Sequence, residues 1–80
     1  PMPEVRYFAG AKAAAGVDSE ICNESTLAAI IESRTIEHGP KLGQILGACS
    51  FLVDGTLARE LDRELPTDAT IDVLPPFAGG

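Results

Sequence analysis

The strongest structural signal in the chain is the stretch TIDVLPPFAGG, which occupies residues 70–80. Its first residues alternate between polar and aliphatic side chains, a pattern typical of a strand with one buried face. Pro75 and Pro76 end that strand, because proline lacks an amide hydrogen and fixes φ at about −65°. The sequence therefore predicts a last strand over residues 70–74, followed by an extended tail that ends in Gly79 and Gly80.

Other segments with strand character precede this one, at residues 4–9, 17–22 and 49–53. Between the first two, the sequence predicts an alanine-rich turn over residues 10–16. Asp54-Gly55 is a strong signal for a two-residue hairpin turn, with a return strand that begins at Thr56.

One amphipathic helix is predicted between these strands. Thr26 is a suitable N-cap, Ile30 and Ile31 lie at helical spacing after it, and the helix should end near His38, before a Gly-Pro pair. Residues 41–46 are expected to form a short helix or turn, and residues 59–68 an irregular charged segment. The fold class is therefore α+β, a mixed sheet with one main helix packed across one face.

Composition restricts the classes of function. Eighty residues make one small domain, with little room for an enclosed active site. Twelve acidic against six basic residues give a net charge of −6, which disfavours nucleic acid and anionic membranes as partners and favours a partner with a positive surface. Because no apolar run approaches the length of a membrane span and no signal pattern is visible, we expect a cytoplasmic protein.

The chain offers few residues for catalysis of its own. Cys22 and Cys49 stand alone, without metal-ligand or redox-motif spacing, so we expect them to be inert, buried thiols. His38 lies at a predicted helix end, where a cation favours the helix dipole. No phosphate-binding glycine loop for ATP is present. These observations predict a protein that is not itself an enzyme.

Strand alternation assigns side chains to the two faces of the sheet. The inward-facing residues should be Val5, Tyr7, Phe51, Val53, Ile71 and Val73, which would pack against the helix. The opposite face would then carry large apolar side chains, Phe8, Leu52 and Leu74, beside Arg6 and Asp72. If these strands are neighbours, the apolar residues form an exposed patch near the tail, as expected of a docking surface.

The tail has the properties of a chemical handle. The α-carboxylate of Gly80 has a reference pKa of about 3.3 to 3.7 and is therefore charged and unreactive near neutrality, so another enzyme would have to activate it. Two glycines leave no Cβ beside the carbonyl, which lets the tail enter a narrow channel. From Pro75 to Gly80 the chain spans at most about 20 Å. This length is enough to reach into the active site of a partner.

These residues resemble the ubiquitin-like β-grasp sulfur carriers of the MoaD/ThiS family, and within it the small subunit of molybdopterin synthase. The resemblance covers nearly the whole chain. It is carried by residues 5–9, Lys12, Gly16, residues 51–55, Leu65, Asp68 and above all residues 71–80. It implies a β-grasp domain over residues 1–74 and an extended diglycine tail over residues 75–80.

The resemblance also implies a function and partners. An E1-like enzyme would use ATP to adenylate Gly80, with Gly79 giving access, and sulfur would then replace AMP. The large subunit of molybdopterin synthase would take sulfur from the thiocarboxylate to make the dithiolene of molybdopterin. The chain would be a non-catalytic carrier without a bound cofactor or metal. The expected partner-binding residues are Phe8, Leu52, Leu74, Pro75, Pro76, Phe77, Lys12 and Arg6.

The ending alone leaves the pathway open. A diproline followed by an apolar residue is more similar to the molybdopterin branch than to the thiamine branch, but a carrier for cysteine synthesis ends similarly. A ubiquitin-like modifier would instead be joined through Gly80 to lysines of other proteins. A plain acidic interaction module would not depend on its last residue at all.

Overall fold

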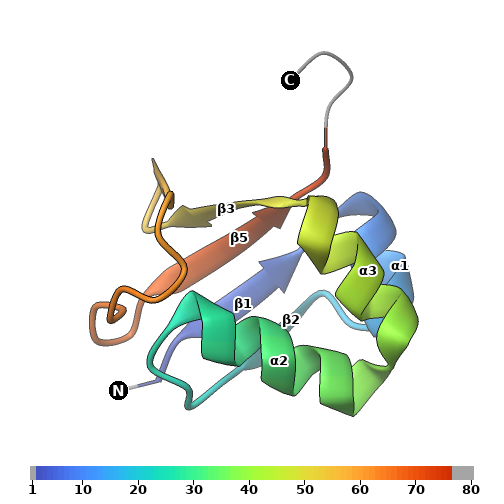
Figure 1. Cartoon of the computed structure of the whole chain (residues 1–80), viewed down its shortest axis with the longest axis horizontal. Helices are drawn as coiled ribbons and strands as arrows, with labels where there is room; N and C mark the ends of the chain where they lie inside the picture. The colour runs from blue at the N-terminus through green and yellow to red at the C-terminus, as the bar shows by residue number, and fades with distance from the viewer. Residues whose placement is uncertain (1, 77–80) are drawn as a thin grey trace.

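The computed structural model describes residues 2–76, which form a mixed sheet with helices on one side. The strands are β1 (Glu4–Tyr7), β2 (Ser19–Ile21), β3 (Ser50–Val53), β4 (Thr56–Leu57) and β5 (Thr70–Leu74). The helices are α1 (Ala9–Ala15), α2 (Leu27–His38) and α3 (Pro40–Ala48). The spatial order β2-β1-β5-β3-β4 puts the last strand at the centre of the sheet (Figure 1). The predicted α+β class is confirmed.

The first and last strands lie side by side. β1 pairs with β5 in parallel, with Val5 opposite Ile71 and Tyr7 opposite Val73, and β3 pairs with β5 on its other side in antiparallel fashion. The inward-facing side chains of these three strands form the core together with aliphatic residues of the helices, which include Leu27, Ile30, Leu42 and Leu46. The predicted assignment of side chains to the buried face is confirmed, with Val53 only partly buried at its margin.

The hairpin and the main helix agree with the sequence-based predictions. Asp54 and Gly55 have φ values of 50° and 85°, the left-handed conformations that a tight turn between β3 and β4 requires. Thr26 caps α2, its hydroxyl oxygen accepting a hydrogen bond from the amide of Ala29 at 3.1 Å. This helix ends at His38, as predicted.

The alanine-rich segment was predicted incorrectly as a turn, because it forms α1. Alanine has the highest intrinsic helix propensity, and burial of Ala11 and Ala15 against the core stabilises a helix too short to be stable alone. Gly16 ends the helix with φ of 79°, and its amide donates to the carbonyl of Lys12 at 2.9 Å. The predicted strand over residues 17–22 is correspondingly shorter and consists only of β2.

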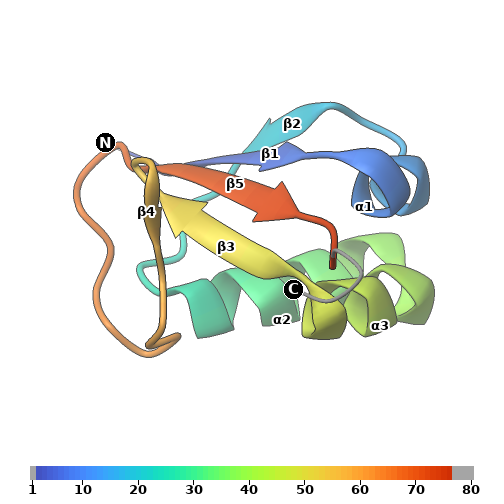
Figure 2. The same cartoon turned by 90° about the horizontal axis from the view of Figure 1, so that it is seen from above.

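The segment after α2 is also more helical than predicted. The short helix or turn expected over residues 41–46 extends over nine residues as α3, with Pro40 in its first turn, where proline is tolerated. Leu42 and Leu46 are buried, so α3 covers the same face of the sheet as α2 (Figure 2). The main predicted helix therefore shares its face with a second one, and within residues 2–76 the other face of the sheet carries no helix.

Gly43 lets α2 and α3 approach each other closely. A Cβ added at Gly43 would lie 2.6 Å from Cγ2 and 2.9 Å from Oγ1 of Thr35, both shorter than normal contacts. Thr35 cannot easily move away, because its hydroxyl donates to the carbonyl of Ile31 at 2.7 Å. A Cβ at Gly47, on the same helix, would meet no atom within 4 Å. The two glycines of α3 therefore have different roles, and only Gly43 is a packing residue.

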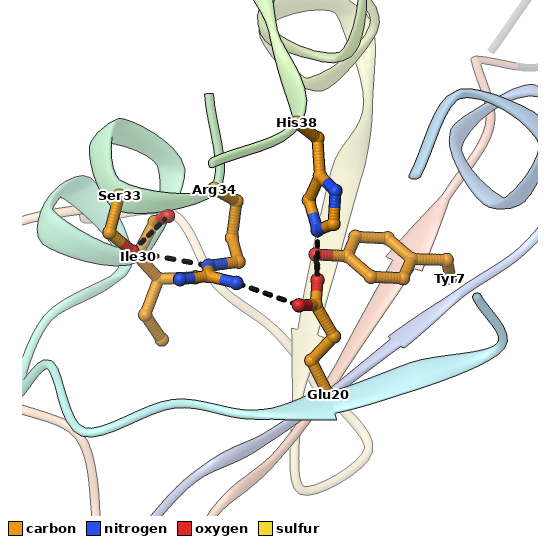
Figure 3. A network of polar contacts seen from close by, with 6 residues as sticks. All are labelled: Tyr7, Glu20, Ile30, Ser33, Arg34 and His38. Atoms are coloured by element: carbon orange, nitrogen blue, oxygen red, sulfur yellow. Dashed lines mark hydrogen bonds and ion pairs between the residues drawn. The ribbon is translucent and has the colours of Figure 1, made fainter. Parts of the chain in front are cut away.

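A polar cluster fixes the edge strand β2 to the rest of the fold (Figure 3). The carboxylate of Glu20 accepts hydrogen bonds from the Tyr7 hydroxyl and from Arg34 Nη1, each at 2.7 Å. His38 Nε2 lies 2.6 Å from the same carboxylate, and its ring meets that of Tyr7 edge-on. The cluster joins β1, β2 and the C-terminal half of α2.

The cluster changes the acidity of its members. Partial burial alone would raise the pKa of Glu20, but hydrogen bonds from Tyr7 and His38 and the charge of Arg34 outweigh it. The pKa of Glu20 is therefore lowered from its ordinary value of 4.5. Burial, together with the hydrogen bond to this carboxylate, raises the pKa of Tyr7. The folded state thus favours an ionised Glu20 and a neutral Tyr7 hydroxyl.

The Gly43 contact gives a first prediction. Gly43→Ala should lower the free energy of unfolding by about 1–2 kcal/mol, because the added methyl group overpacks the contact with Thr35 by more than the gain in helix propensity. Gly47→Ala is the matched control on the same helix and should raise the free energy of unfolding by up to about 1 kcal/mol. Urea unfolding of both variants measures this; equal stabilisation by the two substitutions would show that the contact is not tight.

The Glu20 cluster gives a second prediction. Glu20→Gln should lower the free energy of unfolding by about 1–3 kcal/mol near neutral pH, because charged hydrogen bonds are lost. Since the pKa of Glu20 is lowered on folding, its contribution is fully present above pH 4.5 and is lost as the pH falls through the folded-state pKa. The difference between variant and parent should shrink in acid.

Glu32→Gln is the control for this substitution, because Glu32 is an exposed residue of α2. It should change the free energy of unfolding by less than about 0.5 kcal/mol. A Glu20→Gln effect that is independent of pH in urea unfolding would contradict the ionised cluster.

Candidate functional site

The tail begins at a point that the sheet register fixes. Tyr7 pairs with Val73 and Ser50 pairs with Leu74. Because α1 begins just after Tyr7 and α3 ends just before Ser50, one end of each helix lies beside the last residue of β5. Figure 1 shows the end of β5 next to these helices. Three separate parts of the chain therefore meet at the root of the tail: the junction of β1 and α1, the junction of α3 and β3, and the end of β5.

Between these elements lies an apolar hollow, which we call the root groove. It has a volume of about 360 Å³. Its walls include Gly10 and Ala11 of α1, Ile45, Ala48 and Cys49 at the end of α3, and Pro75 and Pro76 of the tail. The small residues on α1 and α3 leave the space that larger side chains would fill. Sequence reasoning missed this groove, because it depends on the two helices that the sequence did not predict fully.

A larger hollow, of about 440 Å³, lies between the start of α2 and the segment after β4. Leu27 and Val53 contribute to its wall. Val53 pairs with Ile71, near the start of β5, so this hollow is at the opposite end of the sheet from the tail. Its larger volume would favour this hollow as a binding site. The diglycine tail, however, is the feature whose chemistry the sequence identifies, so we place the candidate site at the root of the tail.

The uncovered face of the sheet carries apolar side chains, which we call the outer patch and define by Phe8, Leu52, Leu57 and Leu74. Leu74 lies at the root of the tail, whereas Leu57 also lines the larger hollow. Leu52 pairs with Leu57 on β4 and lies diagonally to Leu74 across β3 and β5. Phe8 follows β1 in an extended conformation, with φ of −133°, and is 41% exposed. The structure thus places Phe8, Leu52 and Leu74 on one face, as predicted, and adds Leu57, which is 45% exposed.

The predicted cationic residues have partners of opposite charge. Arg6 lies opposite Asp72 across the β1–β5 pair, and its Nε and Nη2 donate to the two carboxylate oxygens at 2.5 and 2.9 Å. The hydrogen bonds and charge of Asp72 raise the pKa of Arg6. Lys12 on α1 forms an exposed ion pair with Asp18 at 2.9 Å. Both cations stay accessible at the surface, and their role in partner binding remains a prediction.

The two cysteines are free thiols with little tendency to ionise. Cys22 is buried and Cys49 is half-buried in the wall of the root groove. Burial raises the pKa of both thiols, which favours their neutral forms. Within residues 2–76, no three His, Cys, Asp or Glu side chains are grouped as a metal ion would require. In the same part of the chain, no helix is long and apolar enough to cross a bilayer.

Several predicted site residues lie beyond the part that the structure describes. Phe77, Gly79 and Gly80 are outside residues 2–76. Pro75 and Pro76 are inside it, with Pro75 half-buried and Pro76 exposed. The structure therefore shows where the tail starts, and the role of the diglycine remains a prediction.

Comparison with known proteins agrees with this arrangement. The sequence profile of the ThiS family matches residues 5–80. No curated protein sequence matches the chain significantly. One chain in a complex of subunits 1 and 2 of molybdopterin-converting factor from Helicobacter pylori is 26% identical with a TM-score of 0.70, and the alignment covers 100% of this chain and 100% of that one.

Two further solved structures show the same fold at lower identity. The small archaeal modifier protein 1 of Methanosarcina acetivorans is 23% identical with a TM-score of 0.85, over 99% of this chain and 96% of that one. A Pyrococcus furiosus protein provisionally assigned as molybdopterin converting factor subunit 1 is 24% identical with a TM-score of 0.82, over 95% and 98%. These likenesses confirm the ubiquitin-like β-grasp fold. With a family profile matched over almost its whole length, the chain belongs to the ThiS family of small ubiquitin-like proteins.

Proposed function

We propose that this protein is a sulfur carrier, the small subunit of a molybdopterin synthase, whose Gly80 becomes a thiocarboxylate. The observation that carries the proposal is a diglycine tail on a ThiS-family chain, rooted at the end of the central strand and beside an apolar outer patch. The sulfur would be donated for the dithiolene of molybdopterin. We assign no catalytic role or bound cofactor to the chain itself and place it in the cytoplasm.

The chemistry proceeds in two steps on partner enzymes. An E1-like enzyme joins the Gly80 carboxylate to the α-phosphate of ATP and releases pyrophosphate. A sulfur nucleophile then attacks the unhindered glycyl carbonyl, and AMP leaves with the electron pair of the broken C–O bond. If sulfide attacks, the product is the thiocarboxylate; if a persulfide attacks, a thiol must afterwards reduce the acyl disulfide. A closed partner site would limit hydrolysis of the product.

The outer patch supplies the docking surface in this proposal. An apolar surface beside the tail lets a partner bind the folded domain while it receives the last residues in its active site. The Helicobacter pylori protein, which is similar over its full length, was solved as a complex of subunits 1 and 2. By analogy, the large subunit would cover Phe8, Leu52 and Leu74, and the E1-like enzyme would use an overlapping surface.

A second function uses the same diglycine end. In a protein modifier, the activated carbonyl of Gly80 would be attacked by a lysine amine, and an isopeptide bond would replace the thiocarboxylate. The fold shared with a small archaeal modifier protein is compatible with this alternative. Carriers for thiamine or cysteine synthesis would form the same thiocarboxylate but deliver sulfur to other enzymes. The product formed at Gly80 separates the carrier from the modifier.

The proposal predicts that deletion of Gly80 abolishes sulfur loading without unfolding the domain. Residues 2–76 form the sheet and the core that the structure describes, so we expect thermal stability to be unchanged. Intact-protein mass spectrometry after incubation with the E1-like enzyme, ATP and sulfide should detect a thiocarboxylate on the parent chain only. Ala78→Gly is the control that keeps the length of the tail and should still load. Loading of the shortened chain would refute the role of Gly80.

A further prediction concerns the outer patch. Leu74→Glu should weaken binding to the large subunit by at least about tenfold, because a carboxylate would be placed in an apolar contact. Ile36→Glu is the matched control, since Ile36 is 80% exposed on α2 and lies outside the patch. Isothermal titration calorimetry measures both affinities, after thermal unfolding has shown that each variant is folded. Equal affinities would remove Leu74 from the interface.

A further inference from the structure

We propose that the root groove is the docking site for the side chain of Phe77 from the same chain, which holds the tail against α1 and α3. This contact does not depend on the sulfur-carrier proposal. It would form whether Gly80 ends in a thiocarboxylate, an isopeptide bond to a lysine or an unmodified carboxylate.

The groove has the surface chemistry that an aromatic ring requires. Ala11 is buried at one wall, and Ile45 and Ala48 of α3 contribute aliphatic carbon at the other. The thiol of Cys49, whose pKa is raised by burial, adds a neutral and apolar wall rather than an anionic one. Gln44 supplies a polar side chain to the lining. The volume of about 360 Å³ leaves room for a phenyl ring.

The position of the occupant follows from the covalent chain. Pro76 is itself part of the groove lining, and the next Cα lies only about 3.8 Å along a trans peptide. Residue 77 therefore starts at the groove, and it is a phenylalanine, the large apolar residue of the segment after the diproline. Among residues 77–80, Phe77 has the large apolar side chain, and the residues after it are Ala78, Gly79 and Gly80.

The diproline favours this contact over a freely moving end. Pro75 and Pro76 have fixed φ angles, and Pro75 is already half-buried, so the chain leading to Phe77 has little conformational entropy left to lose. Covering the groove would remove apolar surface of both the ring and the walls from water. The free energy gained by burying apolar surface is therefore opposed by only a small loss of conformational entropy.

Docking of Phe77 would define the working length of the tail. Only residues 78–80 would extend beyond the anchor, which gives a reach of about 10 Å. A partner would then either accept this short end or remove Phe77 from the groove before it could receive a longer one. The groove thus assigns Phe77 a role in presenting the terminus, in addition to any contact with partners.

The contact can be tested by NMR on the full chain, with Phe77 and the methyl groups of Ile45 and Ala48 labelled. Docking predicts nuclear Overhauser effects between the ring and both methyl groups, and an upfield ring-current shift of the Ile45 methyl signals that Phe77→Ala abolishes. Ala48→Glu should also abolish these effects, because it places a carboxylate in the groove. Gly47→Glu is the matched control, since it adds the same charge at a neighbouring position outside the groove lining and should leave them unchanged.

Each other outcome overturns the proposal. Absence of these effects, with Phe77 signals typical of an unfolded peptide, would show that the groove is free for a different molecule. Effects that appear only between differently labelled molecules in a mixed sample would show that the occupant is Phe77 of a second copy. Effects that persist in Ala48→Glu would place the ring outside the root groove.

Discussion

Parallel pairing of the first strand with the last is the interaction on which the rest of the structure depends. It brings Val5 and Tyr7 next to Ile71 and Val73, and all four side chains are almost completely buried. A parallel pair requires a long crossover connection, and here the connection supplies α2 and α3, which cover the inner face of the same strands. Because β5 is central, the tail leaves from the best supported strand rather than from an edge.

This arrangement separates residues that maintain the fold from residues that are free to contact partners. Glu20, Arg34 and His38 are committed to one another at the β2 edge, and Arg6 is committed to Asp72 on the outer face. The exposed side chains of the outer patch have no such polar partners, whereas the root groove is walled partly by residues that also pack in or against the core, such as Ala11 and Ile45. Since Leu74 belongs to the patch and Pro75 to the groove, the tail starts between two apolar surfaces on different sides of the sheet.

Much of this fold could be predicted from local sequence, and the remainder depends on tertiary contacts. The turn at Asp54-Gly55 and the cap at Thr26 were predictable, because each rests on residues adjacent in the chain. α1 was not, since a short alanine segment between glycines is unstable until Ala11 and Ala15 pack on the core. The length of α3 was underestimated for a similar reason, because this helix is stabilised by burial of Leu42 and Leu46 against the core.

The candidate site shows the same division. Alternation along the strands was enough to place Phe8, Leu52 and Leu74 on the uncovered face. Leu57 joins them only through the register of β4, and the root groove only through the packing of two helices beside β5. The cluster around Glu20 joins residues from three separate elements, and no spacing in the sequence indicates that they meet.

The most direct test of the central claim is the chemical state of Gly80 in the protein purified from its own cells. A reagent that traps thiocarboxylates should be added at lysis, and the C-terminal peptide should then be fragmented by mass spectrometry. Our account predicts a trapped sulfur in place of one carboxylate oxygen, located at Gly80. Gly80 found only in isopeptide linkage to lysines of other proteins, with no trapped sulfur, would contradict it and identify the chain as a protein modifier.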